Sequence, residues 1–78
     1  MTIQEQESFQ DYIRSIEDEL LEQVTADYIW LAAQYDDEQD ARFRWRRGAC
    51  RAECARRRKL RIWYNAERAV GGPMPQVA

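Results

Sequence analysis

Residues 42–64 read RFRWRRGACRAECARRRKLRIWY, and this segment decides how the rest of the chain is interpreted. It holds 10 of the 12 basic residues and two of the three tryptophans. It contains one glycine and no proline, and its apolar residues recur at steps of three and four, which is typical of an α-helix. Gly71, Gly72 and Pro73 then form a strong helix stop. The sequence therefore predicts a long helix over about residues 38–70.

Projecting this helix at 100° per residue separates two faces. The first face carries small residues with a tryptophan towards each end: Ala41, Trp45, Gly48, Ala49, Ala52, Leu60, Trp63, Ala66 and Val70. The opposite face is an arginine stripe with one phenyl ring and both thiols: Phe43, Arg47, Cys50, Arg51, Cys54, Arg57, Arg58, Arg61 and Arg68. We expect the first face to pack against another helix and the second face to lie in solvent.

Gly48 is the weak point of this helix, because a glycine in a helix interior costs about 1 kcal/mol relative to alanine. Gly48 falls on the predicted packing face, where a small residue lets a neighbouring helix approach closely. We therefore predict a continuous helix through Gly48. The alternative is a break there, which would divide the second half of the chain into two helices.

The first half of the chain predicts a second long helix, over about residues 3–35. Thr2 and Glu5 have the spacing of a capping box, so the helix is expected to begin near Ile3. Apolar residues then recur along one face: Phe9, Ile13, Ile16, Leu20, Val24, Tyr28, Leu31 and Tyr35. The acidic residues 36–40 read as a tight connection, and residues 71–78 read as a flexible tail.

The predicted fold class is therefore all-α, with a single helical domain over residues 1–70 formed by two long antiparallel helices. A hairpin centred near residues 36 and 37 places residue i opposite residue 73 − i, so that Asp27 lies beside Arg46 and Glu17 beside Arg56. Such a hairpin leaves part of its apolar surface uncovered, and a chain this short has a marginal core. Dimerisation into a four-helix bundle would cover that surface.

Charge is strongly segregated along the chain. Residues 1–40 contain 12 acidic residues and one basic residue, a net charge of −11, whereas residues 41–78 contain 11 basic and two acidic residues, a net charge of +9. The overall charge of −2 conceals this asymmetry. Segregation of this kind predicts either neutralisation within the fold or two surfaces with different partners.

The sequence favours a protein without enzymatic activity. It has no histidine, its serines and threonines lie in no catalytic motif, and its three glycines do not form a phosphate-binding loop. Cys50 and Cys54 are one helical turn apart, and two thiolates are too few for a zinc site unless a second copy supplies two more. We therefore expect no catalytic residue, no metal and no cofactor.

The cellular location is predicted from two absences in the sequence. No apolar segment approaches the roughly 20 residues of a membrane-spanning helix, and the acidic N-terminal region lacks the form of a signal peptide. Two reduced thiols are also typical of a cytoplasmic protein. We expect no membrane association and a cytoplasmic location.

The arginine stripe is where a function is expected to lie, and it has three interpretations. The arginines could pair with the acidic half of the chain, contact nucleic-acid phosphates, or bind an acidic surface of another protein. We favour a small interaction protein of the adaptor or inhibitor type that binds a protein partner, with a nucleic-acid-binding regulator as the alternative; a homodimer is compatible with both. The predicted binding residues are Arg47, Arg51, Arg57, Arg58, Arg61, Phe43 and Tyr64.

Overall fold

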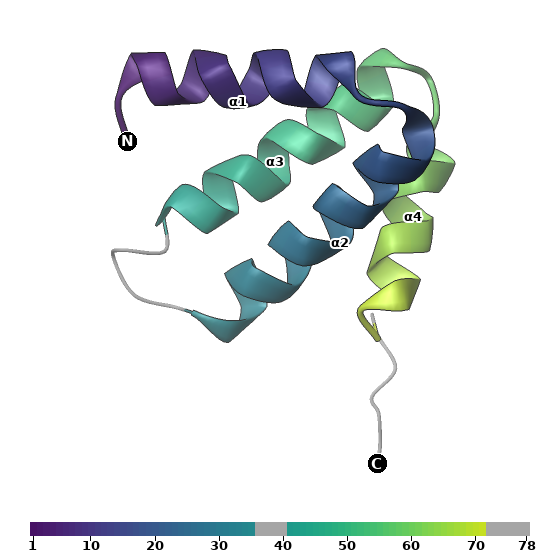
Figure 1. Ribbon diagram of the computed structural model, residues 1–78. Helices are drawn as coiled ribbons and strands as arrows, with labels where there is room; N and C mark the ends of the chain where they lie inside the picture. The colour runs from purple at the N-terminus through teal and green to yellow at the C-terminus, as the bar shows by residue number, and fades with distance from the viewer. Residues whose placement is uncertain (36–40, 72–78) are drawn as a thin grey trace.

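The computed structural model describes residues 1–35 and 41–71, and within these ranges it contains helices and no strand (Figure 1). The all-α prediction is confirmed, but the prediction of two long helices is wrong, because each of them is divided in two. The four helices are α1 (Ile3–Ser15), α2 (Asp18–Gln34), α3 (Ala41–Arg56) and α4 (Leu60–Ala69). The predicted connection over residues 36–40 lies outside the described residues, as does the predicted tail from residue 72 onward.

Helix α1 begins where its sequence predicts. The backbone N–H of Glu5 donates to Thr2 Oγ1 at 3.1 Å, and the backbone N–H of Thr2 donates to Glu5 Oε1 at 3.2 Å. These reciprocal bonds form the predicted capping box and satisfy N–H groups that a helix N-terminus leaves without partners. Phe9 and Ile13 then form the buried side of the helix.

The first break separates α1 from α2 at Ile16 and Glu17. Both residues are extended, with ψ angles of 156° and 167°. Helix α2 then starts with Asp18 and Glu19 in its first turn, where negative charge is favoured by the helix dipole. This acidic cluster is a helix-start signal within the first half of the chain.

The second break lies between Arg56 and Leu60, and α3 continues through Gly48 as predicted. Arg58 has a φ of 60° in the left-handed region. The N–H of Lys59 donates to the carbonyl of Cys54, and the N–H of Arg58 donates to the carbonyl of Ala55, both at 2.9 Å. These bonds form a Schellman motif, in which the left-handed position is usually occupied by glycine. Because arginine occupies this position, the end of α3 lacks the glycine that usually marks such a helix end in a sequence.

Helix α2 lies at the centre of the fold and packs against both α3 and α4 (Figure 1). Helices α2 and α3 run side by side in opposite directions, while α1 crosses α3 near the top of the view. Arg46 contacts Tyr28, the residue after its predicted neighbour Asp27, so the predicted register is close. The predicted ion pairs are nevertheless wrong, because Asp27 is exposed and Arg56 pairs with Glu53 rather than with Glu17.

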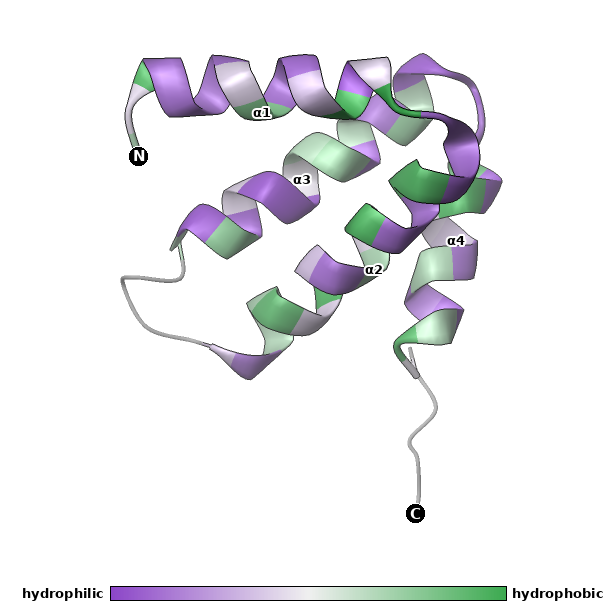
Figure 2. Cartoon of the chain, viewed as in Figure 1, coloured by the Kyte–Doolittle hydropathy of each residue, from purple (hydrophilic) through white to green (hydrophobic). Residues whose placement is uncertain are grey.

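The core forms where the four helices meet, and it includes both cysteines. Its buried members are Phe9, Ile13, Leu21, Val24, Cys50, Cys54, Ile62 and Trp63. Figure 2 shows hydrophobic segments alternating with hydrophilic segments along α2 and α4.

The predicted division of the second half into two faces is only partly correct for α3, where Trp45 and Ala49 pack against the core as predicted, and it is correct for α4. Cys50 and Cys54, predicted on the arginine stripe, have an exposed fraction of 0%, whereas Gly48 and Ala52, predicted to pack, are exposed. In α4, Trp63 and the alanine that follows one turn later are buried as predicted. The break before α4 shifts the helical phase by about half a turn, so one projection cannot describe both helices.

Candidate functional site

Arg57, a predicted partner-binding residue, lies inside the molecule. Its side chain is 13% exposed. Its Nη2 donates to the backbone carbonyls of Ile13 at 2.7 Å and Ile16 at 2.8 Å. These carbonyls belong to the end of α1, where the last turn of a helix has no backbone donors of its own. Arg57 thus supplies hydrogen-bond donors to the C-terminus of α1, although it lies far from α1 in the sequence.

Two carboxylates hold Arg57 in place. Its Nη1 bonds Asp18 Oδ1 at 2.8 Å, and its Nε bonds Glu53 Oε2 at 2.7 Å. Lys59 Nζ reaches the other oxygen of Asp18 at 2.6 Å, and Arg56 also binds Glu53. We call this set of five residues the corner network. It joins the α1–α2 connection to the α3–α4 connection.

Both carboxylates of the corner network are favoured in their ionised forms. Hydrogen bonds from Arg56, followed by those from Arg57, hold the pKa of Glu53 below its usual value although the side chain is only 3% exposed. Hydrogen bonds from Lys59 and then Arg57 lower the pKa of Asp18 in the same way. Every charge in the network therefore has a partner of opposite sign.

A different group of residues, from α3, α4 and the turn between them, is exposed or half-buried and carries four positive charges. We call it the outer arginine surface: Arg47, Arg51, Arg58, Arg61 and Tyr64. Arg51, Arg58 and Arg61 are exposed, Arg47 is half-buried, and Tyr64 is 47% exposed. Arg61 and Tyr64 lie on one face of α4 because they are three residues apart.

One member of this set, Arg51 on α3, contacts Trp63 on α4. The guanidinium of Arg51 lies 5.4 Å from the centre of the Trp63 ring, which is a cation–π contact between the two helices. Within residues 1–35 and 41–71, Arg47, Arg58 and Arg61 make no ion pair. Arg58 and Arg61 are exposed, so their charge is directed to solvent rather than to the acidic helices α1 and α2.

Phe43 does not belong to this surface. Its ring packs against the rings of Tyr28 and Tyr35, with centroids 6.4 Å and 5.8 Å away. Both tyrosines are contributed by the α2 side of the molecule. The structure therefore brings Arg47, Arg51, Arg58, Arg61 and Tyr64 to the outside of α3 and α4, and it separates Phe43 and Arg57 from them.

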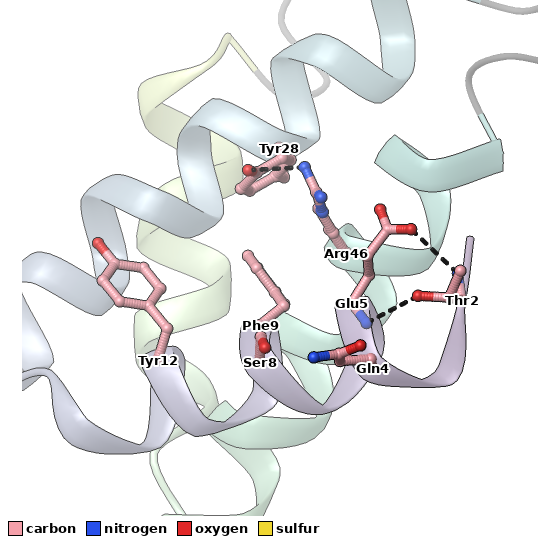
Figure 3. A pocket seen from close by; sticks show the side chains of 8 residues that line it. All are labelled: Thr2, Gln4, Glu5, Ser8, Phe9, Tyr12, Tyr28 and Arg46. Atoms are coloured by element: carbon pink, nitrogen blue, oxygen red, sulfur yellow. Dashed lines mark hydrogen bonds between the residues drawn. The ribbon is translucent and has the colours of Figure 1, made fainter.

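The structure also contains a groove that the sequence did not predict. Its volume is about 530 Å³, and residues from α1, α2 and α3 line it (Figure 3). These are Thr2, Gln4, Glu5, Ser8, Phe9, Tyr12, Tyr28 and Arg46. Phe9 and Tyr28 were predicted on one apolar face, but no local signal placed Arg46 beside them.

Arg46 lies between aromatic rings in this groove. Its guanidinium carbon is 5.5 Å from the centre of the Phe9 ring and 5.6 Å from that of Tyr28. Its Nη1 donates a long hydrogen bond of 3.3 Å to the Tyr28 hydroxyl. Its Nε is buried and has no hydrogen-bond partner. Because Nε is enclosed by protein, a ligand in the groove meets the terminal nitrogens of the guanidinium instead.

The two cysteines have the properties of core residues. Burial raises the pKa of Cys50 to about 11, and burial also raises the pKa of Cys54. At Cys54 the charge of Arg57 acts in the opposite direction, and the effect of burial on the pKa is larger. Among the described residues, no group of three or more potential metal-binding side chains lies together.

Comparison with known proteins adds no assignment. No protein-family model matches the sequence, and neither a curated protein nor a solved structure matches the chain. In the part of the chain that the structure describes, no helix is both long enough and apolar enough to cross a membrane.

Proposed function

We propose that this protein is a small non-enzymatic interaction protein whose outer arginine surface binds an acidic surface of a protein partner. The observation that carries the proposal is Arg58. It is exposed, it makes no ion pair within the described ranges, and its backbone adopts a left-handed conformation that disfavours a side chain. A residue kept at an unfavourable backbone position is a candidate for function.

The composition of the surface supports a protein partner. Arginine and tyrosine are enriched among the residues that contribute most to protein–protein binding. Tyr64 supplies an exposed ring on the same face of α4 as Arg61. Arg51 is positioned by its contact with Trp63, so less side-chain freedom is lost when it binds.

The acidic half of the chain favours protein over nucleic acid as the partner. Glu19 and Asp27 are exposed on α2, and Glu7 and Asp11 are exposed on α1. These carboxylates would repel phosphate groups that approach from their side. An acidic protein surface of limited extent can contact α3 and α4 without approaching these carboxylates.

Affinity capture from the native host tests this proposal. The wild type is compared with an Arg51→Ala, Arg58→Ala, Arg61→Ala triple variant, and Arg14→Ala on α1 is the control. All captures are made with and without nuclease. A protein that is retained by the wild type and the control after nuclease treatment, and lost by the triple variant, supports the proposal.

Two other results would contradict it. Capture that disappears on nuclease treatment would indicate nucleic-acid binding by the same surface, with a steep dependence on salt. Equal capture by the wild type and the triple variant would show that the outer arginine surface is not the recognition surface.

A further inference from the structure

The groove between α1, α2 and α3 has the size and lining of a small-molecule site. Its volume of about 530 Å³ lies in the range typical of such sites. Phe9 and Tyr28 are arranged edge to face, with ring centres 5.3 Å apart, and Tyr12 lies 6.4 Å from Phe9. Tyr12 is 45% exposed, so part of its ring surface is free for contact. These rings favour a flat apolar ligand.

Arg46 is the positively charged hydrogen-bond donor of the site. Its Nε is enclosed by protein, so a ligand in the groove meets the terminal nitrogens of the guanidinium. Within the described residues these make one hydrogen bond, the 3.3 Å contact of Nη1 with Tyr28. A guanidinium with a single long hydrogen bond has terminal N–H groups left for an acceptor, and it presents them in a fork that matches a carboxylate. A carboxylate bound there would also be close to the aromatic rings that flank the guanidinium (Figure 3).

Glu5 limits the charge that the groove can accept. Its carboxylate lies at the rim, and hydrogen bonds with Thr2 lower its pKa, so it is ionised at neutral pH. The Glu5 carboxylate therefore repels an anionic ligand, and this repulsion grows with the negative charge of the ligand. A ligand with a single negative charge fits this balance better than a phosphate ester with two charges.

We propose that this groove binds a small aromatic carboxylate, with the carboxylate on the Arg46 guanidinium and the ring against Phe9, Tyr12 and Tyr28. The site uses none of the residues of the outer arginine surface, and it is independent of the function proposed above.

The test uses 2-naphthoate as the probe and its neutral analogue 2-naphthamide for comparison, with binding to the full chain followed by calorimetry and by NMR. We expect saturable binding of one naphthoate per chain, and binding of naphthamide weaker by about tenfold because the charge-assisted hydrogen bonds are lost. The largest NMR shifts are expected at Phe9, Tyr12 and Tyr28. Absence of saturable naphthoate binding, or equal binding of both compounds, would overturn the proposal.

Variants show whether the probe occupies this groove. Arg46→Gln should weaken naphthoate binding by about tenfold, and Tyr12→Ala by about threefold. Glu5→Gln keeps the capping box and should strengthen binding by about twofold, because it removes a repulsive charge. Arg61→Gln, on the outer arginine surface, is the matched control and should leave binding unchanged.

Circular dichroism establishes that each variant is folded. If Arg46→Gln does not fold, Tyr12→Ala and Glu5→Gln decide the question, because both positions are exposed. Loss of binding in Arg61→Gln with retention in Tyr12→Ala would place the probe on the outer arginine surface and overturn the proposal.

Discussion

Arg57 and Arg58 are neighbours in the sequence and have opposite environments in the fold. Arg57 is largely buried and bonds two carboxylates and two backbone carbonyls. Arg58 is exposed, makes no ion pair within the described residues and adopts a left-handed backbone conformation. One arginine of the corner network therefore stabilises the fold, while the next one belongs to the outer arginine surface. The comparison shows that a run of like charges does not form one functional unit.

The largest effect that tests this comparison is expected at Arg57. Arg57→Ala leaves Glu53 buried without one of its partners and leaves the carbonyls of Ile13 and Ile16 without a donor. Breaking a buried ion pair in this way should lower the free energy of unfolding by about 3 kcal/mol. Urea denaturation measures the change.

Two other variants make that measurement specific. Arg57→Lys should also be destabilised, because an ammonium group cannot reproduce the fork that reaches all four acceptors. Arg61→Ala, on the exposed surface, should change the stability by no more than about 0.5 kcal/mol. Equal stability of Arg57→Ala and Arg61→Ala would show that the corner network is unimportant for the fold.

Acid should act on the corner network and leave the charge of the outer arginine surface unchanged. The folded pKa values of Glu53 and Asp18 lie below the values of 4.5 and 3.8 for free side chains. At pH values between the folded and unfolded pKa values the unfolded chain binds more protons, so stability rises with pH. The contribution is complete above the unfolded values and is lost as the pH falls through the folded values.

Urea denaturation across the acidic range measures this loss, and Asp18→Asn provides the comparison. The variant removes one of the two titrating groups of the network, so its stability should depend less steeply on pH than that of the wild type. Identical slopes for the two proteins would contradict the linkage between Asp18 ionisation and folding.

Arg58→Gly should stabilise the protein while removing a charge from the outer arginine surface. Glycine adopts the left-handed conformation at φ 60° without the steric cost of a side chain, so we expect a gain of about 1 kcal/mol. Arg58→Ala keeps the side-chain penalty and should have the stability of the wild type. Thermal unfolding compares the three proteins, and a less stable Arg58→Gly would refute this account of the helix end.

The smallest change is expected at Gly48, in the middle of α3. A Cβ added there meets no atom within 4 Å, and the position is exposed. Gly48→Ala should therefore stabilise the protein by about 0.8 kcal/mol through helix propensity alone. A loss of stability in thermal unfolding would instead indicate the close packing contact that the sequence pattern suggested.

Local signals predicted several features of this fold. The Thr2 and Glu5 spacing placed the start of α1, and Gly71, with a φ of 102°, follows the end of α4 as predicted. The break between α3 and α4 was not predicted, because Arg58 occupies a turn position where glycine was the expected signal. Without this break, one helical projection was applied to both α3 and α4. It therefore placed Cys50 and Cys54 on the wrong face of α3.

The candidate sites were predicted in part. Arg51, Arg58 and Arg61 of the predicted arginine stripe are exposed, and so is Tyr64, a predicted binding residue outside the stripe. Arg57 could not be distinguished from Arg58 by sequence, because its environment depends on acceptors more than 35 residues away, at Asp18 and in the last turn of α1. The groove at Arg46 was not predicted for the same reason, since three helices contribute to it.

The sequence by itself determined that the chain is helical, that its charge is divided between two halves, and that α1 begins at a capping box. These properties follow from residues close to one another in the chain. Tertiary structure alone decided where the long helices break and which arginines remain exposed. The reason is that a guanidinium is buried only where several acceptors converge, and here α1, α2 and α3 supply them to Arg57 together.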